Sequence, residues 1–84
     1  MKYEWSTREN SLLYVCSESG HDRRGNKVST GQIRGRIVFE PDLTFTVRTG
    51  VHNVLKASLA DLESARSYLS GLILQWDNEE PFYD

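Results

Sequence analysis

The side chains that could perform nucleophilic or metal chemistry are few in this chain and stand far apart. Cys16 is the one cysteine, and His21 and His52 are the two histidines that could act as its general base. Cys16 stands within "LLYVCSES", an apolar segment typical of a buried strand, and buried cysteine is usually inert packing. Neither CxxC nor HxxxH spacing supports a zinc site. The sequence therefore predicts no catalytic residue, no metal ligand and no cofactor, and we expect the protein not to be an enzyme.

Anion binding is the other chemistry that the residue types allow. The segment "HDRRGNKVSTGQIRGR", residues 21–36, holds half of the chain's 10 basic residues and a single acid. A phosphate-binding loop would need glycine, lysine and a hydroxyl residue in succession at the start of a helix, and Asn26 interrupts that order. The five cations of the segment remain candidate partner-binding residues; they are Arg23, Arg24, Lys27, Arg34 and Arg36.

Three interpretations of this basic segment remain open. It could be a solvated loop between two strands, a contact loop for an acidic protein surface, or a nucleic-acid-binding hairpin that contacts phosphates. No aromatic residue lies between Tyr14 and Phe39 to stack on bases, and the isoelectric point is about 5.6. The solvated loop is the default interpretation; of the two binding interpretations, protein contact is favoured and nucleic-acid binding is the alternative.

Composition places the chain among small globular proteins. Its 84 residues fit one domain, 1–84, with 38% hydrophobic residues, 26% charged residues and a net charge of -2. The acids of residues 77–84 form a negatively charged tail, whereas residues 21–36 are positively charged. No apolar run is long enough for a membrane helix, no secretory signal is apparent, and the single cysteine favours a reducing compartment. We expect a cytoplasmic protein that does not associate with membranes.

Alternating apolar residues predict the strands that would position these groups. Residues 33–40 and 43–48 alternate in polarity around a Pro41-Asp42 turn, which predicts a hairpin. Ile33 is expected on the core face, and Arg34 and Arg36 on the polar face. The preceding residues 21–31 are expected to form a mobile, solvated tip.

Three further segments favour extended structure. Residues 12–19 read as a strand covered on both faces. Within residues 2–10, the alternation of Tyr3 and Trp5 favours an edge strand over a helix capped at Ser6. Residues 51–58 can add a short strand after the hairpin.

A periodic segment near the C-terminus predicts the main helix. Ser58 can cap it, with Asp61 completing a weak capping box, and the helix would run from about Leu59 to Trp76. Its expected core stripe recurs at spacings of three and four residues; the stripe is Leu59, Leu62, Ala65, Leu69, Leu72, Ile73 and Trp76.

The opposite face of this helix carries little charge, although solvated helix faces normally carry Lys, Glu and Arg. Ser67, Gly71 and Leu74 mark it as a candidate contact surface for a partner or for a second copy of the chain. The alternative is that the C-terminal Phe82 and Tyr83 fold back and cover it.

A few hairpin strands, the helix "KASLADLESARSYL" and an acidic tail resemble the small accessory proteins that bacteriophages and other mobile elements encode. The resemblance lies in general build and assigns no residue roles. It implies a protein that inhibits a host complex by steric blocking, as anti-CRISPR proteins do. We therefore expect an α+β domain, with an antiparallel sheet of three to five strands and one C-terminal helix. Its expected function is non-enzymatic binding to a protein or protein complex, which could be a host nucleoprotein complex.

Overall fold

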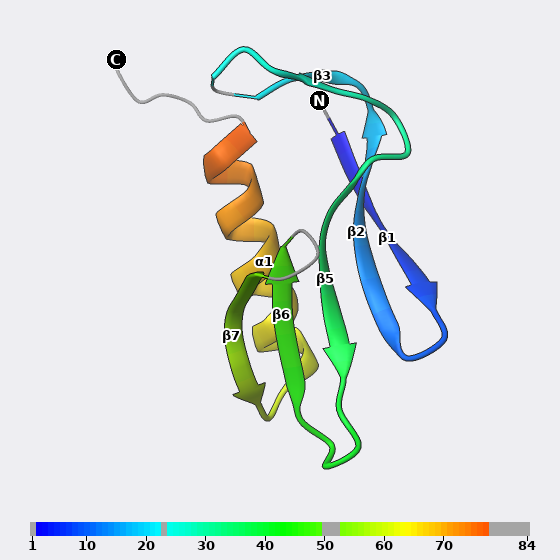
Figure 1. The fold of residues 1–84 in the computed structure, drawn as a ribbon, viewed down its shortest axis with the longest axis vertical. Coiled ribbons are helices and arrows are strands. Elements are labelled where there is room, and N and C mark those ends of the chain that lie inside the picture. The colour runs from blue at the N-terminus through cyan, green and yellow to red at the C-terminus, as the bar shows by residue number, and fades with distance from the viewer. Residues whose placement is uncertain (1, 23, 50–52, 78–84) are drawn as a thin grey trace.

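The computed structural model describes residues 2–22, 24–49 and 53–77, which form a sheet with one helix packed on one of its faces (Figure 1). The five-stranded sheet has the order β1-β2-β5-β6-β7, and all its neighbouring strands are antiparallel. This confirms the expected α+β class. The strands are β1 (Lys2–Arg8), β2 (Ser11–Glu18), β3 (Gly20–His21), β4 (Lys27–Val28), β5 (Ile33–Phe39), β6 (Phe45–Thr49) and β7 (Asn53–Leu59), and the helix is α1 (Leu62–Asp77).

The hairpin of β1 and β2 confirms that the N-terminal segment is a strand. Glu9 has a φ of 22° at its turn, a backbone region that few non-glycine residues adopt. Trp5 lies opposite Tyr14 with the ring centroids 4.5 Å apart, and Tyr3 stacks on the same tyrosine at 5.0 Å. Such aromatic pairs contribute about 0.5–1.5 kcal/mol beyond the area they bury, so they fix the edge strand to the sheet.

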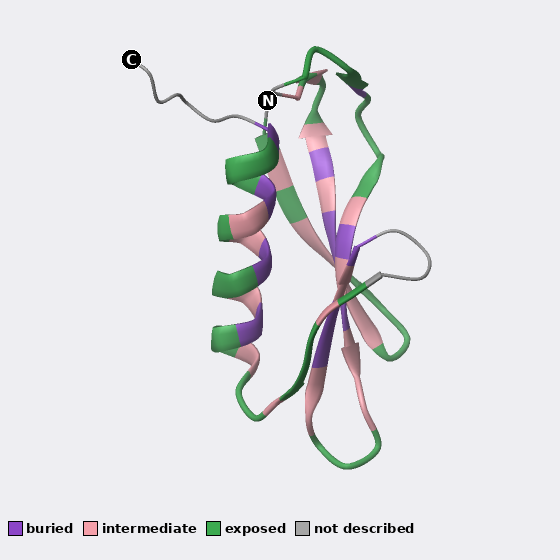
Figure 2. Ribbon diagram, turned by 60° about the vertical axis from the view of Figure 1, so that its left-hand side comes forward, coloured by how far each residue is buried: buried purple, intermediate pink, exposed green. Residues whose placement is uncertain are grey.

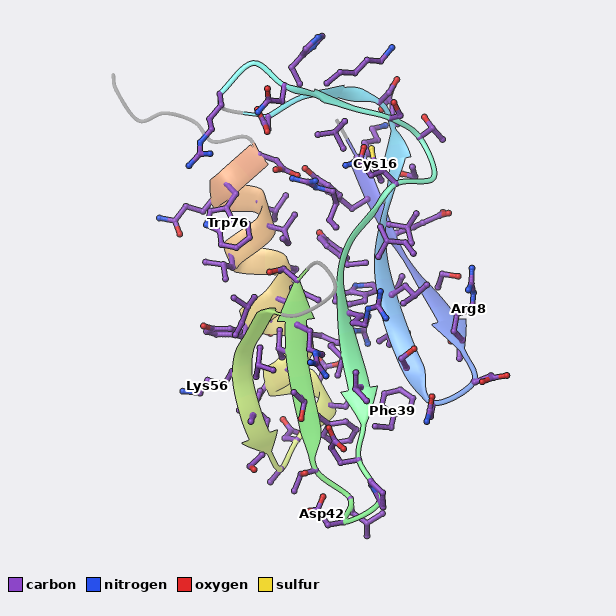
Figure 3. The ribbon with its side chains drawn as sticks, in the orientation of Figure 1. Arg8, Cys16, Phe39, Asp42, Lys56 and Trp76 are labelled. Atoms are coloured by element: carbon purple, nitrogen blue, oxygen red, sulfur yellow. The ribbon has the colours of Figure 1, made fainter. Side chains whose placement is uncertain are left out.

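The hairpin of β5 and β6 also forms as the alternation predicts. Its turn is held by Asp42, whose Oδ1 accepts hydrogen bonds from the Thr44 backbone nitrogen at 3.2 Å and the Thr44 hydroxyl at 2.6 Å. These bonds favour the charged carboxylate and hold the pKa of Asp42 below its usual value. Asp42 is therefore a turn residue, at the far tip of the hairpin (Figure 3).

The core lies between α1 and the sheet, and the buried residues of α1 follow its strand-facing side (Figure 2). Ile37 of β5 lies opposite Val47 of β6, and both side chains are fully buried. They pack in one cluster with Ala65, Leu69 and Ile73 of the helix. The spacing of four residues within this helical set places all three on one face, as the periodicity predicts.

The helix begins three residues later than the sequence predicts. Its first residue is Leu62, and Asp61 rather than Ser58 caps it, because the Asp61 Oδ2 accepts a hydrogen bond from the Ser64 backbone nitrogen at 3.1 Å. Leu59 belongs to β7, where it pairs with Phe45. The expected strand at residues 51–58 is confirmed from Asn53 onward, and its pairing extends through Leu59.

The end of the helical stripe also differs from the prediction. Trp76 is 39% exposed, and Asp77 takes the buried position instead. An α-helix has 3.6 residues per turn, so residues spaced by four lie on nearly the same face. The buried set Ala65, Leu69 and Ile73 therefore continues to Asp77. The buried face therefore ends on a carboxylate, which requires a partner.

Two glycines should respond in opposite ways to alanine. At Gly35 of β5, an added Cβ would stand 2.7 Å from Leu69 Cδ1 and 3.2 Å from the Arg48 carbonyl oxygen, so the helix could not approach as closely. Gly35→Ala is expected to destabilise the fold by about 1–3 kcal/mol through overpacking. Gly71 of α1 has nothing within 4 Å of the same position, and Gly71→Ala is expected to stabilise the helix by up to about 1 kcal/mol. Urea unfolding of both variants checks the signs, and equal signs would contradict this account of helix packing.

Candidate functional site

The basic segment folds as a small hairpin that extends the β2–β5 connection. Asp22 organises its turn, since Oδ1 accepts hydrogen bonds from the backbone nitrogens of Arg24 at 2.9 Å and Asn26 at 2.8 Å. The bond from Asn26 is the main reason that the pKa of Asp22 lies below its usual value. At the other side of this hairpin Val28 is buried, which corrects the expectation of a wholly solvated tip. A buried anchor of this kind gives the exposed charges a defined position.

The five cations of the segment do not share one surface. Arg24 and Lys27 are exposed on the β3–β4 hairpin, as expected of its tip, and Arg23 lies outside the described residues. Arg34 and Arg36 are half-buried in β5. The expectation that β5 begins at Ile33 is confirmed, but the two β5 arginines have different surroundings.

A β-bulge turns Arg34 away from the face predicted for it. Tyr14 of β2 lies opposite Gly35 and Val15 lies opposite Ile33, so Arg34 is an extra residue without a partner in the ladder. A bulge of this type re-aims the side chain at that position. Arg34 therefore reaches the helix side rather than sharing the polar face with Arg36, and Ile33 is 42% exposed rather than in the core.

Arg34 forms a bidentate ion pair with Asp77 at the C-terminal end of α1. Its Nη2 lies 2.7 Å from Oδ1 and its Nε lies 3.0 Å from Oδ2. The Tyr3 hydroxyl donates a third hydrogen bond to Oδ2 at 2.8 Å. The Asp77 side chain is 0% exposed and that of Arg34 19% exposed. The ion pair thus joins the helix to β5, and Tyr3 joins the same carboxylate to β1.

The electrostatics of this cluster follow from burial and hydrogen bonding. Hydrogen bonding to Asp77 raises the pKa of Arg34 above its already high value. Burial, and then the hydrogen bond to Asp77, raises the pKa of the Tyr3 hydroxyl well above its usual value. A carboxylate at a helix C-terminus also faces the negative end of the helix dipole. Arg34 offsets that repulsion by pairing with Asp77, so the cluster acts as a structural link between α1, β5 and β1.

Replacing Tyr3 with phenylalanine should reduce the amount of stability that the protein loses at alkaline pH. Because the folded pKa of Tyr3 is raised, its stabilising contribution is complete below the unfolded pKa of about 10 and is lost as pH rises through the folded value. We expect wild type to lose more stability than Tyr3→Phe as pH rises beyond about 10. Melting temperatures of both proteins across this range measure the difference, and a gap independent of pH would contradict the proposed role of the hydroxyl.

An open pocket of about 440 Å³ lies beside this cluster, between the β3–β4 hairpin and the end of α1. Its walls combine two acids with two arginines, so their charges largely compensate one another. Asp77 and Arg34 are already bonded to each other, and Asp22 holds its own turn. The pocket therefore offers few uncommitted polar groups; its lining residues are Asp22, Arg24, Arg34, Trp76 and Asp77.

The remaining chemical candidates occupy structural positions. Cys16 is fully buried in β2, near the β3–β4 hairpin (Figure 3), and its thiol donates to the Glu18 carbonyl oxygen at 3.3 Å. His21 is exposed on β3, and His52 lies outside the described residues. Within residues 2–22, 24–49 and 53–77, no cluster of histidine, cysteine and acidic side chains could hold a metal ion. In the same ranges, no helix has the length and apolarity needed to cross a membrane.

The outer face of α1, defined as Ser64, Ser67, Tyr68, Gly71 and Leu74, is exposed (Figure 2). Leu74 is 43% exposed, and the helix has Glu63 as the one charged residue in its exposed set. The expectation of an uncharged exposed face is therefore confirmed for these residues. The alternative cover, Phe82 and Tyr83, lies outside the described residues, as does the predicted acidic tail after Asp77.

Sequence reasoning missed Tyr3 and Asp77 as members of one cluster. Asp77 stands four residues after Ile73, so the periodicity of the buried stripe could have marked it as buried. The bulge that brings Arg34 to it leaves no comparable signal in the sequence, because it depends on how β2 and β5 pair.

The fold and these sites define a small α+β domain in which Asp22, Asp42 and Asp61 hold turns or a helix start, and Tyr3, Arg34 and Asp77 link elements. Comparison with protein-family models, with curated proteins and with solved structures finds no match to the chain. The exposed surfaces are therefore the basis for assigning its function.

Proposed function

We propose that the chain is a non-enzymatic binding protein that acts by occupying a site on a protein partner. The observation that carries the proposal is the outer face of α1, which is exposed and uncharged along its length from Ser64 to Leu74, apart from the flanking Arg66. Gly71 has open space around it, so no contact among the described residues accounts for a residue that costs a helix about 1 kcal/mol. The small side chains of Ser64, Ser67 and Gly71 allow close approach of a partner, with Leu74 as an apolar anchor.

The surroundings of the reactive groups support a binding role. Asp22 and Asp42 hold turns, Asp77 is saturated by Arg34 and Tyr3, and Cys16 is buried. Each group is committed to a structural contact, so none of them supports a reaction as the function of the chain.

The β3–β4 hairpin supplies the second part of the proposed surface. Arg24 and Lys27 are exposed there, next to Arg23 in the sequence. Exposed cations of this kind steer an acidic partner toward a docking face and raise the association rate more than the final affinity. The proposed partner is therefore an acidic protein or complex. If the chain acts as the small phage accessory proteins do, this partner is a host complex in the cytoplasm, and the chain blocks it.

Affinity capture from a bacterial lysate, followed by quantitative mass spectrometry, tests this proposal. Wild type and Leu43→Glu should retain the same protein, because Leu43 is exposed on the β5–β6 turn, away from α1. Leu74→Glu introduces the same change on the outer face of α1 and should lose that protein. Retention that is equal in all three baits, or no specific retention by wild type, would contradict the proposal.

Two further measurements separate the alternatives. A second copy of the chain as the partner would appear as a dimer in sedimentation that Leu74→Glu dissociates. Nucleic-acid binding would appear as sub-micromolar affinity for a labelled single strand or duplex, with a steep dependence on salt. If replacing Arg23, Arg24 and Lys27 with alanine abolished that affinity, the basic hairpin would be a nucleic-acid-binding module instead.

A further inference from the structure

Two arginines face each other on the side of the sheet that α1 leaves uncovered. Arg36 of β5 lies directly opposite Arg48 of β6 in the strand register. Ile37 and Val47, their neighbours in sequence, point into the core against α1, so the two arginines point to the other side. The sheet has no helix of the described chain on that side (Figure 2). We call this surface the open face.

The pair carries an electrostatic cost within the isolated chain. Like charges directly opposite each other on neighbouring strands destabilise a sheet. Neither guanidinium makes a hydrogen bond or ion pair with another described residue, although both side chains are half-buried. The Nε of Arg48 is buried without a hydrogen-bond partner among the described residues, and native proteins rarely leave such a donor unsatisfied. Two facing positive charges are therefore not neutralised by any described acid.

Two acids adjoin this surface, and neither forms an ion pair with Arg36 or Arg48: Glu9 lines a pocket beside Arg36, and Glu40 is engaged elsewhere. Glu40 accepts a hydrogen bond from the Thr46 hydroxyl at 2.8 Å, and Thr46 lies two residues along β6 from Arg48. Arg34, the other β5 arginine, has its own carboxylate on the helix side. Within the described chain, the charge of Arg34 is therefore neutralised by a carboxylate, whereas the charges of Arg36 and Arg48 are not.

Aliphatic side chains surround the arginine pair. The register continues the row outward, with Leu13 of β2 opposite Arg36 and Val54 of β7 opposite Arg48. An open pocket of about 370 Å³ adjoins Arg36. Arg8, at the end of β1 (Figure 3), borders it and adds a third cation. The pocket is lined by Arg8, Glu9, Asn10, Ser11, Leu13, Ile33 and Arg36.

We propose that the open face docks an acidic segment of the protein partner, with carboxylates seated on Arg36 and Arg48 and aliphatic side chains on the exposed Ile33 and Val54. This inference deepens the proposed function and depends on it, since it names the chemistry of the partner. The guanidinium group suits carboxylates because it presents its donors as a planar fork. No aromatic side chain adjoins the pair in the register row, so the face lacks the stacking platform that single-stranded nucleic acid requires.

Titration of the ¹⁵N-labelled protein with a short peptide of alternating glutamate and leucine tests the inference by NMR. We expect amide shifts centred on β2, β5, β6 and β7, with a strong dependence on salt. The Arg36→Gln/Arg48→Gln double variant should bind the peptide at least about tenfold more weakly, because charge-assisted hydrogen bonds are lost. Arg66→Gln is the matched control, since Arg66 lies on α1 over the Trp5 ring, and it should bind as wild type does.

Three results would overturn the inference: no binding, equal binding by the double variant, or shifts centred outside the open face. A peptide of alternating lysine and leucine should not bind. Binding of a short oligothymidine to the same residues, in place of the acidic peptide, would assign the arginines to nucleic acid. Arg36→Gln alone should leave the melting temperature unchanged or raise it, because it removes the facing charge; a lower melting temperature would give Arg36 a structural role instead.

The lysate experiment separates failure of this inference from failure of the proposed function. If a protein is captured through Leu74 and is retained equally by the Arg36→Gln/Arg48→Gln bait, the chain is a binding protein whose open face is not used. If the double variant also loses the protein, both proposals are supported.

Discussion

Truncating Leu69 to alanine is expected to lower the free energy of unfolding by about 2–5 kcal/mol. Leu69 is fully buried at the centre of α1, and its side chain packs directly over Gly35 of β5. A rigid strand backbone cannot move in to fill the space, so the loss includes a cavity in addition to the lost burial. Since a domain of this size has about 5–15 kcal/mol of stability in total, the change removes a large share of it.

Urea unfolding of Leu69→Ala measures this loss, and Leu74→Ala provides the matched control on the same helix. Leu74 is exposed, so its truncation should change stability by no more than about 0.5 kcal/mol. Equal effects of the two substitutions would mean that the buried side of α1 has been assigned wrongly.

The parts of the fold that could be predicted are those in which the sequence pattern reports burial directly. The alternation around Pro41-Asp42 predicts the β5–β6 hairpin because every second residue of a strand faces the core. The spacing of Ala65, Leu69 and Ile73 predicts α1 for the corresponding reason. In both cases the pattern extends over several residues, so no single position decides the outcome.

The start of the helix could not be predicted because two local signals compete there. Ser58 and Asp61 are both good capping residues, and Leu59 fits the helical spacing as well as it fits a strand. The pairing of Leu59 with Phe45 settles the choice, and that contact depends on the register of β7 against β6. Tertiary pairing of this kind overrides local propensity.

The polar contacts were least accessible to sequence reasoning. Tyr3 and Asp77 are 74 residues apart, and Arg34 and Asp77 are 43 residues apart. Charge counting assigned Asp77 to an acidic tail and Arg34 to a basic loop, whereas the structure neutralises each with the other. Arg36 is half-buried and has no ion pair with a described residue, and it could be recognised as such only after Arg34 had been paired and Arg48 had been placed opposite it.

Replacing Arg34 and replacing Asp77 should lower the free energy of unfolding by different amounts. Arg34→Met leaves the Asp77 carboxylate fully buried with the Tyr3 hydroxyl as its one remaining donor among the described residues, whereas Asp77→Leu leaves a guanidinium that is partly exposed to water. Breaking a buried pair costs about 3–5 kcal/mol, and partial exposure reduces that cost. We therefore expect Arg34→Met to destabilise within this range and Asp77→Leu to destabilise less.

The double variant Arg34→Met/Asp77→Leu should recover much of the loss, because a packed apolar pair leaves no charge buried without a partner and is often as stable as the ion pair it replaces. Urea unfolding of the four proteins forms a double-mutant cycle. The summed losses of unfolding free energy in the two single variants should exceed the loss in the double variant by about 0.5–3 kcal/mol.

The Tyr3 hydroxyl limits how much stability the double variant recovers, because it loses its acceptor when Asp77 is replaced. Adding Tyr3→Phe to that background should therefore be nearly neutral, whereas the same change in wild type removes a hydrogen bond to a charged group worth about 1.5–3 kcal/mol. Strictly additive costs would mean that Arg34, Asp77 and Tyr3 do not act as one cluster.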